Sequence, residues 1–199
     1  KRIQRQFLEL IDSLLENAGS DAIILQDYDK GALAPEVISR VILAAGEVSV
    51  PVLVDPKFRS FDLYKNVKLL KPNYKELVHG LNLDLKKQDV DALSRAMIQH
   101  QQKQEIEILL VTLSEQGIIA TRNGECVHIP AIKRKIADVS GAGDTVISVA
   151  SLCLLAGLDA GQTAVISNLA GGQVCEKAGV VPVDAQKLLA ECIRHFKSS

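Results

Sequence analysis

The segment Asp138–Thr145 combines residue types that can bind an anion and remove a proton. It reads Asp-Val-Ser-Gly-Ala-Gly-Asp-Thr and lies directly ahead of an apolar stretch. Gly141 and Gly143 permit a tight turn whose N–H groups point into one concavity, and at a helix N-terminus such a concavity binds anions. Asp144 then lies at the helix start, where the dipole favours an ionised carboxylate. This combination suits phosphoryl transfer, because Asp144 can accept the proton of an attacking hydroxyl.

A structural interpretation of the same residues is a glycine turn followed by an acidic helix cap. It is the commoner one for an isolated Gly-x-Gly-Asp, because Asp is frequent near N-caps. Two other nucleotide-binding motifs are excluded. The sequence holds no Gly-x-x-x-x-Gly-Lys-[Ser/Thr], and Gly-Ala-Gly-Asp-Thr-Val lacks the third glycine of the dinucleotide fingerprint. A P-loop kinase and a Rossmann oxidoreductase are therefore disfavoured.

The octet resembles the second signature of the PfkB, or ribokinase-like, family of sugar kinases, usually Asp-Thr-x-Gly-Ala-Gly-Asp-Thr. The resemblance implies an ATP- and Mg²⁺-dependent kinase in which Asp144 is the catalytic base. It also implies that the amides of Gly141, Ala142 and Gly143 form the anion hole. Farther into the helix the family usually has two small residues, and here the second of them is replaced by Val149.

The segment Pro72–Glu76 matches the family's Asn-x-x-Glu element, which positions magnesium and nucleotide phosphates. The resemblance therefore assigns Asn73, Tyr74, Lys75 and Glu76 to cofactor binding. Glu76 would act on Mg²⁺ through water, since that ion keeps several waters. Asn with Glu three residues later is also a capping box, which is the commoner interpretation of the element alone. The octet downstream favours the functional interpretation.

Two further segments resemble nucleotide-binding parts of the family. The turn at 112–117 is similar to Thr-x-Gly-x-x-Gly, which assigns Thr112, Ser114 and Gly117 to the nucleotide, with Ser114 in place of the first glycine. Asn168 falls where the family often places an adenine or ribose contact. As a single polar residue among apolar ones, it is equally well interpreted as a hydrogen-bonded buried amide.

Two stretches resemble bacterial heptose-7-phosphate kinases more than ribokinase or adenosine kinase, namely Gln26–Leu33 and Val50–Lys57. Those enzymes phosphorylate the anomeric hydroxyl of a heptose 7-phosphate, a step toward ADP-heptose for the lipopolysaccharide core. Lys30 and Lys57 each follow a predicted strand, where a cation could neutralise a phosphate. A solvated lysine is the commoner alternative, and the Asp-Pro turn before Lys57 makes that residue the stronger candidate for cofactor binding.

These residues must be positioned by alternating strands and helices. Apolar periodicity predicts helices at 3–15, 35–45 and 89–104, and over most of 143–196. Short apolar runs predict strands at 22–25, 50–54, 67–70 and 108–111. Asn123-Gly124, between strand-like runs at 118–121 and 125–129, predicts an antiparallel hairpin. The predicted fold is α/β: a ribokinase-like three-layer α/β/α arrangement with a mostly parallel central sheet and a late hairpin, whose ligands bind beyond the carboxyl ends of the strands.

Residues 1–199 are predicted to form a single domain, the nucleotide-binding and catalytic-base portion of a sugar kinase. Kinases of this family normally begin with a further segment that carries much of the sugar pocket and the lid, and that N-terminal segment is expected to be absent here. The chain would then be a C-terminal portion. A nucleotide-binding module without catalysis therefore stays open beside the heptose kinase, as does a kinase for another sugar or nucleoside.

Composition excludes several other classes. With 23 basic and 24 acidic residues, and with four Phe, three Tyr and no Trp, the chain has neither the charge nor the aromatic side chains typical of nucleic-acid binding. No apolar run approaches the roughly 18 residues of a membrane span. The expected partner is a sugar phosphate, and a homodimer remains open. Four scattered cysteines favour a reducing cytoplasm over a disulfide framework or a zinc site; they are Cys126, Cys153, Cys175 and Cys192.

Overall fold

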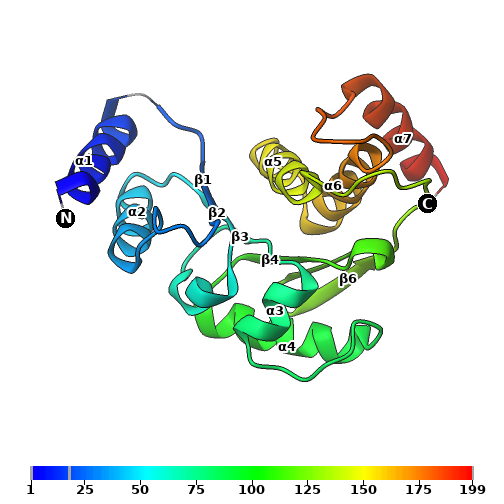
Figure 1. Ribbon diagram of the computed structural model, residues 1–199, viewed down its shortest axis with the longest axis horizontal. Helices are drawn as coiled ribbons and strands as arrows, with labels where there is room; N and C mark the ends of the chain where they lie inside the picture. Colours follow the sequence, from blue (N-terminus) through cyan, green and yellow to red (C-terminus); the bar gives the residue numbers. More distant parts are fainter. Residues whose placement is uncertain (1, 18, 199) are drawn as a thin grey trace.

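One six-stranded sheet organises the protein, and its strand order follows the chain (Figure 1). The computed structural model describes residues 2–17 and 19–198. The strands are β1 (Ile23–Gln26), β2 (Val52–Asp55), β3 (Leu69–Leu70), β4 (Ile108–Thr112), β5 (Ile118–Arg122) and β6 (Glu125–Ile129). β1 to β4 are parallel, whereas β5 is antiparallel to both β4 and β6. The mostly parallel sheet is confirmed, and the four parallel strands were predicted to within two residues.

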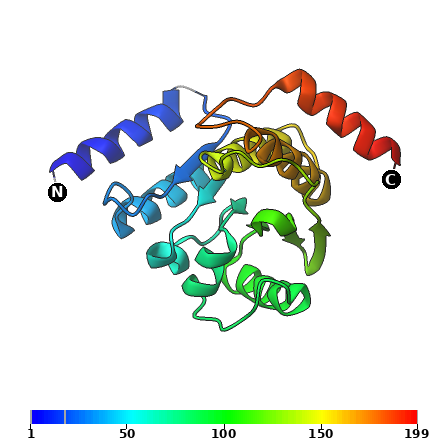
Figure 2. The same cartoon turned by 45° about the vertical axis from the view of Figure 1, so that its right-hand side comes forward.

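Helices cover both faces of this sheet, which confirms the three-layer α/β/α arrangement. The helices are α1 (Arg2–Asn17), α2 (Pro35–Glu47), α3 (Tyr74–Gly80), α4 (Val90–Gln104), α5 (Ala142–Leu155), α6 (Ala160–Val174) and α7 (Ala185–Ser198), with 3₁₀ helices η1 (Phe58–Leu63) and η2 (Ser114–Gln116). α1 to α4 lie on one side of the sheet, and α5 and α6 lie on the other (Figure 1). α1 and α7 lie at opposite ends of the molecule (Figure 2). Among the described residues no helix is long and apolar enough to cross a membrane.

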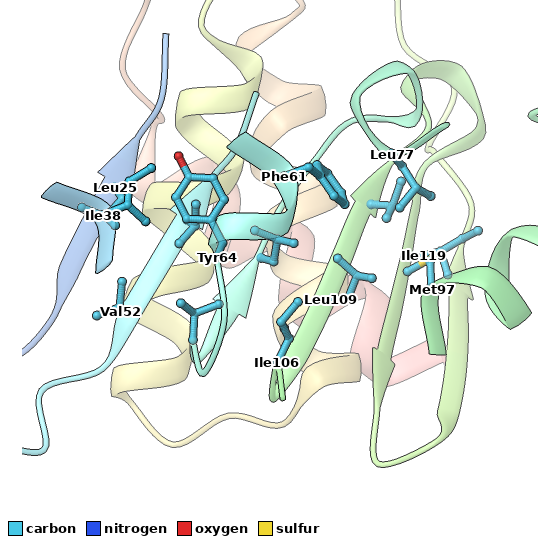
Figure 3. Close-up of a cluster of buried hydrophobic side chains, with 14 of the residues drawn as sticks. Leu25, Ile38, Val52, Phe61, Tyr64, Leu77, Met97, Ile106, Leu109 and Ile119 are labelled. Carbon is cyan, nitrogen blue, oxygen red and sulfur yellow. The ribbon is translucent and has the colours of Figure 1, made fainter. Parts of the chain in front are cut away.

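Successive residues of the central strands enter two separate apolar clusters. Leu109 of β4 belongs to the cluster under α2, α3 and α4, which Figure 3 shows, and Leu110 belongs to the cluster under α5 and α6. Val54 and Leu53 of β2 divide in the same way. Because neighbouring side chains of a strand point to opposite faces, a sheet covered on both sides needs unbroken apolar strands. This is why these strands appear in the sequence as short continuous apolar runs.

The β5–β6 hairpin forms where the sequence predicts it. Asn123 and Gly124 both have positive φ, 53° and 81°, as a two-residue hairpin turn requires. The hairpin is followed by residues 130–141, which form neither helix nor strand. This segment takes the chain across to the other face of the sheet, so that α5 begins close to the end of β2, with which it is in contact.

Candidate active site

At or directly after the end of each of the four parallel strands, a polar residue lines one cleft of about 880 Å³. Gln26 and Asp55 end β1 and β2, Lys71 directly follows β3, and Thr112 ends β4. The N-terminus of α5 lines the same cleft. The cleft is therefore at the edge where the carboxyl ends of parallel strands meet, which is where α/β sheets bind ligands.

The glycine octet forms the N-terminus of α5 as predicted. Gly141 is the N-cap residue and adopts a left-handed conformation with φ 76°. The Ala142 N–H donates to Val139 O at 3.2 Å, whereas within the described residues no acceptor takes the N–H of Gly141 or Gly143. Of the three amides assigned to an anion hole, the turn itself therefore uses that of Ala142. Gly141 and Gly143 leave theirs open to an anion.

Asp144 lies in the first turn of α5 and lines the cleft. Its Oδ1 accepts a hydrogen bond from the Tyr28 hydroxyl at 3.2 Å, and it takes part in no ion pair with any described residue. Desolvation and the nearby Asp144 carboxylate raise the pKa of Tyr28, so the phenol stays a donor. Asp144 is thus exposed, oriented and free to accept a proton.

A buried ion pair that sequence reasoning missed lies beside the octet. Lys71 Nζ is 3.0 Å from Asp55 Oδ1, and their side chains are only 3% and 6% exposed. Gln26 Nε2 donates to Asp55 Oδ2 at 2.9 Å. A Cβ added to Gly143 would be 3.7 Å from Lys71 Nζ. The lysine ammonium therefore lies close to Gly143. Its signal in the sequence was a charge placed directly after an apolar strand.

The Asn-x-x-Glu element is a capping box, and it also faces the cleft. Glu76 N–H donates to Asn73 Oδ1, and Asn73 N–H donates to Glu76 Oε2, both at 2.9 Å. Lys57 Nζ contacts Glu76 Oε1. Although burial opposes it, the Glu76 carboxylate raises the pKa of Lys57. Asn73, Glu76 and Lys57 all line the cleft, so the structural and functional interpretations of this element are compatible.

Three other candidate residues lie away from the cleft lining. Tyr74 donates its hydroxyl to Leu85 O at 2.5 Å, and Lys75 and Lys30 are exposed. Within α3, Tyr74 and Lys75 are turned away from the face that Asn73 and Glu76 share. The structure therefore brings only the two ends of the element to the site.

The residues around Glu76 fit Mg²⁺ held through water. Both of its oxygens accept hydrogen bonds from the protein, one from Lys57 and one from the Asn73 N–H. Each carboxylate oxygen keeps a second lone pair, which can accept from a metal-bound water. Over the described ranges no group of three or more His, Cys, Asp or Glu could hold a metal by itself. Mg²⁺ is suited to such a site, because it binds mainly to substrate phosphates and waters.

The turn at 112–117 also reaches the cleft, through Thr112, Ser114 and Gly117. Ser114 adopts φ 53°, a left-handed conformation that glycine accepts more readily. Gly117 has φ 92°, and a Cβ there would lie 2.0 Å from Ile129 O. The backbone of the β5–β6 hairpin therefore approaches this turn so closely that only glycine fits.

Replacing Gly117 by alanine is expected to lower the free energy of unfolding by about 2–4 kcal/mol, because backbone strain and a main-chain clash add together. Urea denaturation measures the loss. Gly124→Ala is the matched control, since Gly124 has φ 81° with nothing within 4 Å of an added Cβ, and it should lose only about 1 kcal/mol. Equal losses in the two variants would contradict the close approach at Gly117.

Asn168 makes the hydrogen bonds that the structural interpretation expects. Its Nδ2 donates to Pro130 O at 3.0 Å and to Ile129 O at 3.4 Å. The amide thereby holds the start of the 130–141 segment while still lining the cleft. Beside it the lining combines the apolar side chains of Ala131, Ile132 and Ile136 with the basic residues Lys133 and Arg134.

Asp138, the first residue of the octet, fastens the octet to the loop after α6. Its Oδ1 accepts from Ser140 N–H at 3.0 Å, and its Oδ2 accepts from Gly179 N–H at 2.9 Å. These backbone hydrogen bonds to Ser140 and Gly179 lower the pKa of Asp138 to about 2. The carboxylate therefore stays ionised to low pH.

Since this pKa is lower in the folded protein than in the unfolded chain, the stabilisation by Asp138 is present above about pH 4 and is lost as pH falls toward 2. Asp138→Asn should therefore be less stable than wild type at pH 6, and the difference should shrink between pH 4 and 2. Urea denaturation of both proteins across this range measures it. A difference that does not change with pH would contradict the role of the charge.

Comparison with known proteins identifies relatives over most of the chain. The profile of the pfkB family of carbohydrate kinases matches residues 11–186. The bifunctional protein HldE of Koribacter versatilis is 40% identical over 170 residues, covering 85% of this chain and 35% of that protein. The bifunctional protein HldE of Citrifermentans bemidjiense is 39% identical over 194 residues, which cover 96% of this chain and 39% of that protein. The chain therefore spans little more than a third of the length of these relatives.

Solved structures show the same fold. Phosphofructokinase-2 of Escherichia coli, in complex with potassium, superposes with a TM-score of 0.83 at 21% identity, over 94% of this chain and 62% of that one. A ribokinase from Arabidopsis thaliana, complexed with ribose and ATP, gives a TM-score of 0.74 at 19% identity. The superposition covers 94% of this chain and 58% of the ribokinase chain. At these identities the likeness concerns the fold.

Proposed function

Because this chain belongs to the pfkB family of carbohydrate kinases, we propose that it transfers the γ-phosphoryl group of ATP to the anomeric hydroxyl of a heptose 7-phosphate. The observation that carries the proposal is the meeting of Asp144, the open Gly143 amide and Lys71 in one cleft. The choice of sugar is supported by the stretches Gln26–Leu33 and Val50–Lys57, which resemble heptose-7-phosphate kinases.

Asp144 would act as the general base. The hydrogen bond from Tyr28 holds Oδ1 in place, and Oδ2 has no partner within the part of the chain that the structure describes. A sugar hydroxyl placed against Oδ2 can give up its proton as the oxygen attacks phosphorus. Such proton transfer contributes typically 10²- to 10⁴-fold to a rate.

Negative charge on the transferred group would be stabilised at the start of α5. The N–H groups of Gly141 and Gly143 have no protein acceptor among the described residues, and the helix dipole adds positive potential there. The Lys71 ammonium carries three donors, of which Asp55 takes one. When bound, Mg²⁺ would neutralise phosphate charge beside Glu76. Phosphoryl transfer depends mainly on such positioning and electrostatic stabilisation.

The other end of the cleft suits a nucleotide base. Ala131, Ile132 and Ile136 present apolar surface there next to Gly117, whereas Thr112 lies beside Asn73. ATP would therefore bind with its base toward residues 131–136 and its phosphates toward α5. We place the reaction in the cytoplasm, because all four cysteines are free thiols in the structure.

One observation favours a second function, nucleotide binding without turnover. The chain spans 35% and 39% of the two curated relatives above and 62% of the phosphofructokinase-2 chain. A region that completes the sugar pocket in the longer proteins would then be needed for catalysis.

Two measurements on this chain test the proposal. Calorimetry with Mg²⁺ and a non-hydrolysable ATP analogue measures nucleotide binding, and ADP release measures turnover with heptose 7-phosphate, fructose 6-phosphate, ribose and adenosine as acceptors. We expect heptose 7-phosphate to give the highest kcat/KM by at least about tenfold, roughly a 1.4 kcal/mol preference. A preference for another acceptor would overturn the choice of sugar. Binding without turnover would favour the second function.

A further inference from the structure

We propose that Arg134, which itself lines the cleft, positions the wall formed by residues 131–136 with its apolar side chains Ala131, Ile132 and Ile136. We propose further that α7 thereby controls nucleotide affinity, although none of its described residues lines the cleft. The inference rests on the proposed function, because it takes ATP as the ligand whose base meets this wall. It adds a positioning residue that lies in no recognised motif.

The wall has almost no support of its own. Residues 131–136 form neither helix nor strand, and Ile132 and Ile136 are 51% and 56% exposed. The segment is fixed at both ends, by Asn168 at Pro130 and by the Cys175 carbonyl, which accepts from the Ala137 N–H at 2.8 Å. Between these ends, the hydrogen bonds that the described structure shows are all made by the Arg134 side chain.

The Arg134 side chain is buried between α6 and α7, where it contacts Glu176, Glu191 and Gly172. Its guanidinium binds the Glu191 carboxylate of α7 side-on, at 3.0 and 2.6 Å, and Glu176 accepts from it at 3.1 Å. The side chains of Arg134 and Glu191 are only 7% and 9% exposed. A Cβ on Gly172 of α6 would lie 2.9 Å from Arg134 Nε. The helix therefore leaves room for the guanidinium at this point.

This geometry lets Arg134 act as an anchor, by which we mean that its ion pair with Glu191 fixes residues 131–136 to α7. A bidentate, buried arginine–carboxylate pair fixes direction as well as distance, so the wall follows the position of α7, which packs on α6 (Figure 1). Without the anchor the wall would sample other positions. If it kept the binding position a tenth of the time, the affinity for ATP would fall about tenfold. The phosphate end of the cleft, built by α5 and Lys71, would be unaffected.

The test compares two ligands that share the phosphate end of the site. Calorimetry gives the Kd of ATP, which uses the wall, and of inorganic tripolyphosphate, which does not. We expect Arg134→Met to raise the Kd of ATP about tenfold or more and to leave the Kd of tripolyphosphate within about twofold of wild type. Glu191→Gln changes α7 alone. It should raise the Kd of ATP by a smaller factor and leave the Kd of tripolyphosphate unchanged. It also separates positioning from any direct contact of Arg134 with ATP.

Arg122→Met is the matched control, because Arg122 also pairs with a glutamate, Glu107 at 2.5 Å, but does not line the cleft; both affinities should stay unchanged. Thermal unfolding checks that each variant folds. If Arg134→Met does not fold, the comparison of the two Kd values is made with Glu191→Gln. An unchanged ratio of the two Kd values, or equal weakening of both ligands, would overturn the inference alone. Wild-type protein that binds neither ligand would overturn the proposed function and the inference with it.

Discussion

Replacing Asp144 by asparagine is expected to lower kcat for sugar phosphorylation by about 10²- to 10⁴-fold while leaving nucleotide affinity nearly unchanged. Asparagine has the shape of aspartate and can still accept the hydrogen bond from Tyr28, but its amide cannot take a proton from the acceptor. Asp144 makes no ion pair within the described residues, so the substitution leaves no charge unpaired. ADP release under saturating substrates measures kcat, and calorimetry with an ATP analogue measures binding.

Tyr28→Phe is the matched control for this prediction. It removes the hydrogen bond of 3.2 Å to Asp144 but keeps the carboxylate, so kcat should fall far less than in Asp144→Asn. Activity of Asp144→Asn within about tenfold of wild type would contradict the assignment of the base.

The second large effect concerns stability. Lys71→Met is expected to lower the free energy of unfolding by about 3–5 kcal/mol, because it leaves the Asp55 carboxylate buried and unpaired. Both side chains of the pair are nearly inaccessible to water, and Gln26 alone cannot neutralise the charge. Urea denaturation at neutral pH measures the loss. The same variant should weaken binding of tripolyphosphate, since Lys71 lines the cleft close to Gly143.

Two further variants separate these effects. Lys68→Met removes a lysine from a pair with Glu107 that is about one-third exposed, and it should lose only about 0–1 kcal/mol. Lys71→Met combined with Asp55→Leu replaces the buried pair by apolar side chains, which often restores stability. We expect this double variant to recover stability without recovering phosphate binding. A loss below about 1 kcal/mol in Lys71→Met alone would contradict the cost of the unpaired Asp55.

Local sequence patterns were sufficient to predict most of the fold. Apolar runs flanked by helical periodicity indicated the parallel strands, and Asn123-Gly124 indicated the hairpin, because each depends on a few adjacent residues. The octet at the start of α5 could also be recognised, since its glycines and Asp144 act within one turn. The pairing of Lys71 with Asp55 could not be predicted, because it depends on which strands lie side by side.

The assignment of Tyr74 and Lys75 shows a different limit. A motif names consecutive residues, but only positions three or four apart share a face of a helix. Asn73 and Glu76 therefore meet the cleft, and the two residues between them do not. The pairing of Arg134 with Glu191 could not be predicted from the adjacent basic residues Lys133 and Lys135, since Glu191 lies 57 residues away along the chain.

The connections between β1 and β4 run over the face covered by α2, η1, α3 and α4, whereas the helices that cover the opposite face in the described structure are α5 and α6, which begin at Ala142. A ribosome releases the chain from its N-terminus, so the strands and one helical layer emerge well before Asp144. A chain released before residue 141 would therefore keep the strand ends that line one side of the cleft, but it would lack both the open amides of α5 and the Asp144 carboxylate.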